Sequence, residues 1–142
     1  MNAVRRWLLG WLFAFSFTAN AANPDPYITL HRRQLARLEP SHMASADTQR
    51  ARLLFELTRL YIDKADSYSG ADGSFDSARY FNQSHLLLAH RMQWPLEEAE
   101  ALTFRAKIAH MLNDFDASYQ SALRALSLFS RYPPSQCRNL YV

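Results

Sequence analysis

Along most of this chain, apolar residues recur every three to four positions, which is the spacing of a helix with one face turned to a core. No segment shows the alternation of apolar and polar residues that is typical of a half-buried strand. The pattern predicts five helices, which cover about 27–38, 47–64, 75–92, 95–112 and 115–130. The predicted fold class is therefore all-α.

The residue types at the ends of these segments are those that commonly begin or end a helix. Ser45 or Asp47 is expected to cap the second helix, because a short polar side chain accepts a hydrogen bond from a free backbone N–H of the first turn. Asn113 or Asp114 is expected to end the fourth helix and to cap the fifth across a very tight turn. Pro95 stands where a first-turn proline belongs.

Residues 1–21 have the three parts of a secretory signal peptide. Arg5 and Arg6 give a positive start, the apolar run 7–17 follows, and Ala19 and Ala21 are small residues at the −3 and −1 places of a cleavage site. A membrane anchor is the alternative, but a spanning helix needs about 20 apolar residues and this run is shorter. The sequence therefore predicts an exported protein, periplasmic or secreted, that is cleaved after Ala21 and keeps no membrane span.

Removal of this segment changes what the composition implies. It leaves 121 of the 142 residues, which is enough for one domain with its own core. Loss of Arg5 and Arg6 lowers the net charge from +3 to +1, so the charge is no argument for nucleic-acid binding. Cys137 is the only cysteine and cannot form an internal disulfide, so packing must supply the stability.

Two segments of the chain, 72–87 and 112–127, repeat each other at a constant offset. In the first, Phe75 is followed by an acid and then a helix-forming run, and Phe115 opens the same pattern in the second. Leu86 of the first segment aligns with Leu126 of the second. A period of this length is typical of an array of helix pairs.

Residues 99–129 resemble a tetratricopeptide repeat. That family places large residues, small residues and a polar turn at set positions of a helix pair, here Leu102, Ala106, Asn113, Asp114, Ser118, Ala125 and Leu126. Ala106 and Ser118 are expected to let the two helices approach closely, while Phe115 and Leu126 fill the space beside them. The resemblance implies a short α-solenoid of antiparallel helix pairs.

The earlier copy of the repeat matches the family less well. Leu54 and Leu57 fit its first helix and Ala78 fits its second, but the loop between them is longer than in the later copy. Asn82 and His85 stand where the family prefers apolar or small residues.

The predicted organisation has four parts. They are a signal peptide at 1–21, an N-terminal helix and linker at 22–46, two helix pairs within 47–134 (47–92 and 95–130), and a C-terminal tail at 135–142.

The resemblance also implies a binding surface, because the first helices of successive repeats line a groove that holds a peptide or a partner helix. The inward-facing places on this chain are Arg52, Phe55, Arg59, Ile62, Glu100, Thr103, Lys107 and His110. Arg52, Arg59 and Lys107 would make the groove mildly positive and suited to an acidic segment, since guanidinium groups bind carboxylates bidentately. Ordinary solvated positions are the alternative interpretation.

Candidate catalytic and metal-binding groups are sparse. His85 and His90 are on different faces of a helix, and no histidine has a second ligand at zinc-binding spacing. The Asp-rich loop at 63–76 lacks an acid at the first position of a calcium loop. We therefore expect no enzyme activity, no cofactor and no metal.

Three functions remain open from the sequence. The first is an exported, non-catalytic helical-repeat protein that mediates protein–protein contacts. The second is a periplasmic sensor or input domain, similar to the exported helical regions of bacterial signalling proteins but without an output half. The third is a small enzyme with an unrecognised site. The last predicted helix, 115–130, has no further helix to cover it, which predicts a partner, self-association or a continuation.

Overall fold

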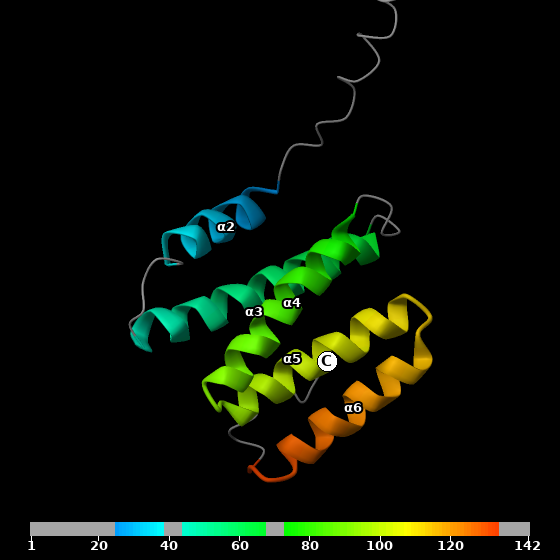
Figure 1. The fold of residues 1–142 in the computed structure, drawn as a ribbon. Coiled ribbons are helices and arrows are strands. Elements are labelled where there is room, and N and C mark those ends of the chain that lie inside the picture. The colour runs from blue at the N-terminus through cyan, green and yellow to red at the C-terminus, as the bar shows by residue number, and fades with distance from the viewer. Residues whose placement is uncertain (1–24, 39–43, 68–72, 134–142) are drawn as a thin grey trace, which may run out of the picture.

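The computed structural model describes residues 25–38, 44–67 and 73–133. This part of the chain contains no strand and five α-helices, which are α2 (Pro26–Leu38), α3 (Ala44–Ser67), α4 (Ser74–Arg91), α5 (Pro95–Met111) and α6 (Phe115–Phe129) (Figure 1). The all-α class and the five helices are thereby confirmed. The predicted signal peptide, the C-terminal tail with Cys137 and most of the loop at 70–73 lie outside the described residues.

The start of α3 differs from the prediction. This helix begins at Ala44, so Ser45 and Asp47 lie inside its first turn and do not cap it. The Asp47 carboxylate instead accepts a hydrogen bond from the Arg50 side chain one turn later. An acid in the first turn still stabilises the helix through its dipole, which explains why the residue type suggested a helix start.

The turns after α4 and α5 have the same geometry. Gln93 and Asn113 both have a positive φ, of 55° and 60°. The next residue in each case donates its backbone N–H to a carbonyl of the preceding helix, from Trp94 to Ala89 and from Asp114 to Ala109, both at 2.9 Å. This is the Schellman arrangement that ends many helices.

Each of these turns leads directly into the next helix. Pro95 occupies the first turn of α5, as predicted. The Asp114 side chain accepts the backbone N–H of Ala117 at 3.1 Å and so caps α6, which confirms the second of the two candidates at that turn. The two turns therefore place α4, α5 and α6 in antiparallel succession without a linker.

The helices pack chiefly in chain order, α2 on α3, α3 on α4, α4 on α5 and α5 on α6, with a smaller contact between α3 and α5. In Figure 1, α2 and α6 lie at opposite ends of this stack. The helices that the sequence paired, α3 with α4 and α5 with α6, are thus neighbours. The solenoid arrangement and membership of the tetratricopeptide family stay predictions.

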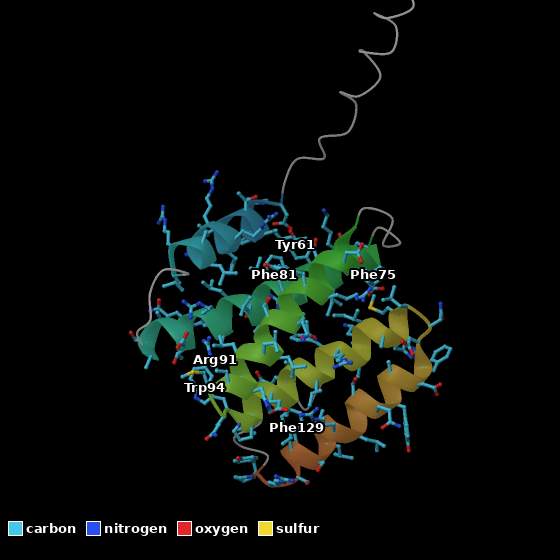
Figure 2. All side chains as sticks on the ribbon, in the orientation of Figure 1. Tyr61, Phe75, Phe81, Arg91, Trp94 and Phe129 are labelled. Carbon is cyan, nitrogen blue, oxygen red and sulfur yellow. The ribbon has the colours of Figure 1, made fainter. Side chains whose placement is uncertain are left out.

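Two apolar clusters hold the stack together. The larger lies among α2, α3, α4 and α5, and includes Leu57 (0% exposed) and the stacked rings of Tyr61 and Phe81, whose centroids are 5.5 Å apart (Figure 2). The smaller joins α5 to α6 and consists of Ala99, Leu102, Ala125 and Phe129. Alanines at these contacts let the helix axes approach closely.

The expected contacts of Phe115 and Leu126 are not formed. Both side chains are exposed, at 59% and 62%, and do not fill space beside Ala106. The side of α6 that meets α5 carries Ser121, Ala125 and Phe129 instead. At about 100° per residue, Phe115 and Leu126 lie well away from that side.

No helix among the described residues combines the length and the apolar character needed to cross a membrane.

Replacing Leu57 by alanine should lower the free energy of unfolding by about 2–5 kcal/mol, because Leu57 is fully buried and the change leaves a cavity. Leu87→Ala is the matched control, since Leu87 is 60% exposed and should change stability little. Urea denaturation followed by circular dichroism measures both variants. Equal midpoints for the two would contradict this description of the core.

Candidate functional site

The predicted groove lies on the face where α3 and α5 approach each other. The rings of Phe55 and Phe104 meet there with centroids 5.0 Å apart. Of the predicted groove residues, Arg52, Arg59 and His110 are exposed, whereas Phe55, Thr103 and Lys107 are half-buried. The ring contact joins α3 to α5 at this face, whereas Arg52 lines a cleft between α2 and α3 together with His31 and Glu56.

Two of the predicted groove residues are not available to a partner. Ile62 is 1% exposed and belongs to the larger apolar cluster, because α3 packs against α2, α4 and α5 and buries more than one face. Glu100 is 3% exposed. The repeat pattern places a residue on a helix face, but how much of that face is covered depends on every neighbouring helix.

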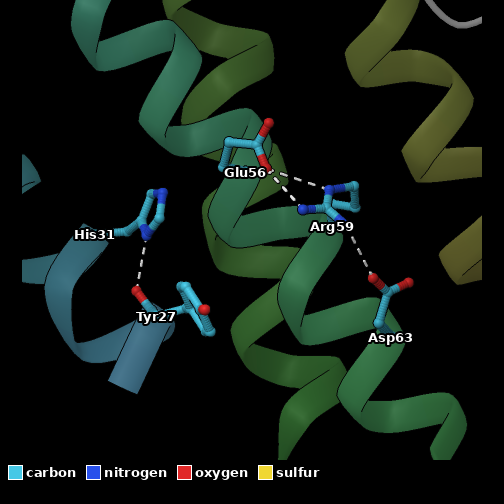
Figure 3. A network of polar contacts seen from close by, with 5 residues as sticks. All are labelled: Tyr27, His31, Glu56, Arg59 and Asp63. Atoms are coloured by element: carbon cyan, nitrogen blue, oxygen red, sulfur yellow. Dashed lines mark hydrogen bonds and ion pairs between the residues drawn. The ribbon is translucent and has the colours of Figure 1, made fainter. Parts of the chain in front are cut away.

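One of the three positive charges expected in the groove, that of Arg59, is paired with acids on the same helix. Arg59 donates to Glu56 at 2.9 Å and lies 3.3 Å from Asp63, one turn before and one turn after it (Figure 3). Both acids are also solvent-accessible, so an acidic peptide would meet them together with Arg59. Surface pairs of this kind contribute little to stability, but they cancel much of the local field.

A polar pair between a buried histidine and a partly exposed glutamate, which was not predicted, joins α4 to α5. His85 is fully buried, and its Nε2 lies 3.1 Å from Oε2 of Glu97. An ionised carboxylate only accepts, so Nε2 carries the proton and donates it. The Phe55 and His85 rings form a T-shaped contact with their centroids 6.2 Å apart. Asn82, which lies one turn before His85, is also buried. Both departures from the repeat pattern therefore lie inside the core.

A second polar cluster ties three helices together at the start of α3. Asp47 accepts from Arg50, lies 3.6 Å from Arg91 of α4, and is itself buried. Arg50 also donates to the carbonyl of Leu38 at 2.6 Å, which fixes the end of α2. A cleft of about 770 Å³ opens beside this cluster, over a floor that includes Leu35 and Leu54.

The most distinct surface feature is an apolar line on α6. It consists of Phe115 (59% exposed), Tyr119 (62%), Leu123 (45%) and Leu126 (62%), and we call it the α6 stripe. These four side chains span about 80° of the helix circumference at about 100° per residue. With about 150–250 Å² for each fully exposed large side chain, they leave roughly 400 Å² of apolar surface in water, the size of the largest patch on a typical monomer.

The α6 stripe is continuous with the predicted groove. The Phe115 ring meets the His110 ring with centroids 5.5 Å apart, so the exposed end of α5 adjoins the start of the stripe. Arg124, on the other side of α6, is held away from the stripe by an ion pair with Glu98 of α5 at 2.6 Å. Along α6, the stripe itself is therefore built of apolar and aromatic side chains without a charge between them.

Within residues 25–38, 44–67 and 73–133, no three His, Cys, Asp or Glu side chains gather closely enough to hold a metal ion.

No family model matches the chain, and neither the curated proteins nor the solved structures contain a significant match.

Replacing Glu97 by alanine should destabilise the fold by about 1–3 kcal/mol, because the buried Nε2–H of His85 loses its acceptor. Glu56→Ala is the control, since it removes a carboxylate from a surface pair with Arg59 and should cost at most about 1 kcal/mol. Denaturant unfolding of the two variants measures the difference. If Glu56→Ala proved the more harmful, the structural role of the His85–Glu97 pair would be refuted.

Proposed function

We propose that this chain is an exported, non-catalytic interaction protein of the tetratricopeptide type, which binds another protein through the α6 stripe. The observation that carries the proposal is the unbroken line of four large apolar side chains on the last described helix. The largest apolar patch on a monomer, which is of about this size, is often functional.

The repeat itself supports the need for a covering helix. Phe75 and Leu86 of α4 are half-buried, and Leu86 packs against the cluster that contains Ala99 and Leu102 of α5. Phe115 and Leu126 occupy the same places on α6, one repeat later, and are exposed. A helix that packed on α6 as α5 packs on α4 would bury both.

The α3–α5 groove is the second part of the proposed contact surface. On α5, Lys107 is half-buried and His110 is exposed, and His110 leads into the α6 stripe. An acidic segment of a partner that runs along the groove would meet these groups after its apolar helix has bound the stripe. Charges at such a rim affect the rate and the specificity of association more than its strength.

Leu126→Asp should abolish capture of a partner from a bacterial envelope extract, because it places a charge within an apolar contact. Leu87→Asp is the matched control, with the same change at a side chain of nearly the same exposure, 60% against 62%, on another helix. Quantitative mass spectrometry of the bound fractions measures recovery. Arg59→Glu with Lys107→Glu tests the groove separately, and we expect it to weaken capture several-fold without abolishing it.

Equal recovery of every bound protein by the wild type and by Leu126→Asp would refute the role of the α6 stripe. Equal recovery by the groove variant would confine the contact to the stripe.

Export can be tested on the full chain expressed in a two-membrane bacterium. We expect the periplasmic fraction to contain a protein whose N-terminus is Ala22, because Ala19 and Ala21 precede that bond. Intact-mass measurement determines the cleavage point. An uncleaved chain that stays with the cell membrane would support the anchor alternative instead.

A further inference from the structure

We propose that the cleft between α2 and α3 binds a small sugar phosphate, with the phosphate group at the end that carries Arg37 and Arg52. The cleft has a volume of about 610 Å³, which lies within the usual range for small-molecule sites. In Figure 1, α2 and α6 are at opposite ends of the stack. The cleft is therefore a separate site, which adds a ligand to the proposed function of the α6 stripe.

Two positive side chains line this cleft without an acid to pair them. Arg37 comes from the last turn of α2 and Arg52 from α3, and both are exposed. Arg50 and Arg91 lie in ion pairs with Asp47, whereas neither of these two forms an ion pair with a described residue. Two guanidinium groups at one cleft repel each other, and a bound oxyanion would offset this repulsion and accept bidentate hydrogen bonds from them.

The course of the two helices places both arginines at the same end of the cleft. α2 and α3 run antiparallel (Figure 1), and Arg50 donates to the carbonyl of Leu38, so the end of α2 lies beside the first turns of α3. Arg37 directly precedes Leu38, and Arg52 follows shortly after Arg50. One group with nearly two negative charges is matched to this pair of arginines, and a phosphate monoester carries that charge at neutral pH.

The other end of the cleft presents hydrogen-bond acceptors in fixed positions. His31 donates from Nδ1 to the carbonyl of Tyr27 at 2.7 Å, so Nε2 of the neutral ring is an acceptor. On the facing helix, the Glu56 carboxylate is held by two hydrogen bonds from Arg59, at 2.9 and 3.2 Å (Figure 3). Sugar hydroxyl groups can donate to these acceptors. A second carboxylate or phosphate on the ligand would instead be repelled by Glu56.

The remaining lining of the cleft is uncharged. Gln34 of α2 and Gln49 of α3 each carry an amide group that both donates and accepts hydrogen bonds, as sugar hydroxyl groups do. Leu53 of α3 adds apolar surface, on which the C–H face of a sugar ring can lie. The cleft thus combines an anion-binding end with a polar, neutral remainder, which fits a ligand with one charged group on a hydroxylated body.

Isothermal titration calorimetry with glucose-6-phosphate and ribose-5-phosphate tests the site, on protein isolated after expression of the full chain. We expect saturable binding of at least one of these probes. Arg52→Gln should raise its Kd about tenfold, because charge-assisted hydrogen bonds to the phosphate are lost. Arg105→Gln is the matched control, with the same change at an exposed arginine of α5 that does not line the cleft, and should leave the Kd unchanged. Circular dichroism of both variants ensures that a loss of binding is not a loss of fold.

Three further probes separate the parts of the ligand. Glucose lacks the phosphate, inorganic phosphate lacks the sugar, and glucuronate carries one carboxylate on the same ring, so each should bind several-fold more weakly than the sugar phosphate. His31→Ala should weaken binding of the sugar phosphate and leave that of inorganic phosphate unchanged, because His31 lies at the sugar end.

Failure of both sugar phosphates to bind, or an equal effect of Arg52→Gln and Arg105→Gln, would overturn the inference. Equal binding of glucuronate would overturn the assignment of a phosphate, and equal binding of inorganic phosphate would overturn the assignment of a sugar.

The α6 stripe can be tested independently of this cleft. Leu126→Asp should bind the sugar phosphate as the wild type does, because Leu126 is on α6 and does not line the cleft. A chain that captures a partner through the stripe but binds no sugar phosphate would refute the cleft site alone. A chain that binds the sugar phosphate but captures nothing would refute the proposed function alone.

Discussion

The two Schellman turns at the ends of α4 and α5 determine how the rest of the structure is arranged. Gln93 and Asn113 adopt the left-handed conformation, which costs a non-glycine residue about 1–2 kcal/mol. In return, the hydrogen bonds to Ala89 and Ala109 reverse the chain within a short turn and start the next helix at once. Because both turns have the same shape, α4, α5 and α6 follow one another in antiparallel order without a linker.

The interior between α4 and α5 is partly polar, and this gives that contact its specificity. Fully apolar faces can slide past each other by a turn with little loss, whereas the His85–Glu97 hydrogen bond forms at one register only. A buried polar group that loses its partner destabilises the fold strongly, so alternative registers are excluded. The Asp47 cluster acts in the same way between α2, α3 and α4, where it holds the end of α2 and the end of α4 against α3.

Sequence patterns predicted the helices well and the contacts between them less well. The roles predicted for Pro95 and Asp114 are confirmed, because a first-turn proline and a helix cap depend only on nearby backbone atoms. Asp47 looked like a cap for the same local reason, but its partner Arg91 is at the far end of the next helix, beyond the reach of any spacing rule. The groove prediction failed at Ile62 and Glu100 because the burial of a side chain depends on all the helices around it.

By itself, the sequence determined the all-α class, the number of helices and nearly all of their limits, because helix periodicity and end signals act within a few residues. Only the tertiary structure decided that Phe115 and Leu126 point away from α5, that His85 is a core residue, and that Arg59 is paired with Glu56. The reason is geometric: a helix has several faces, and the identity of the buried one is set by where the neighbouring helices lie.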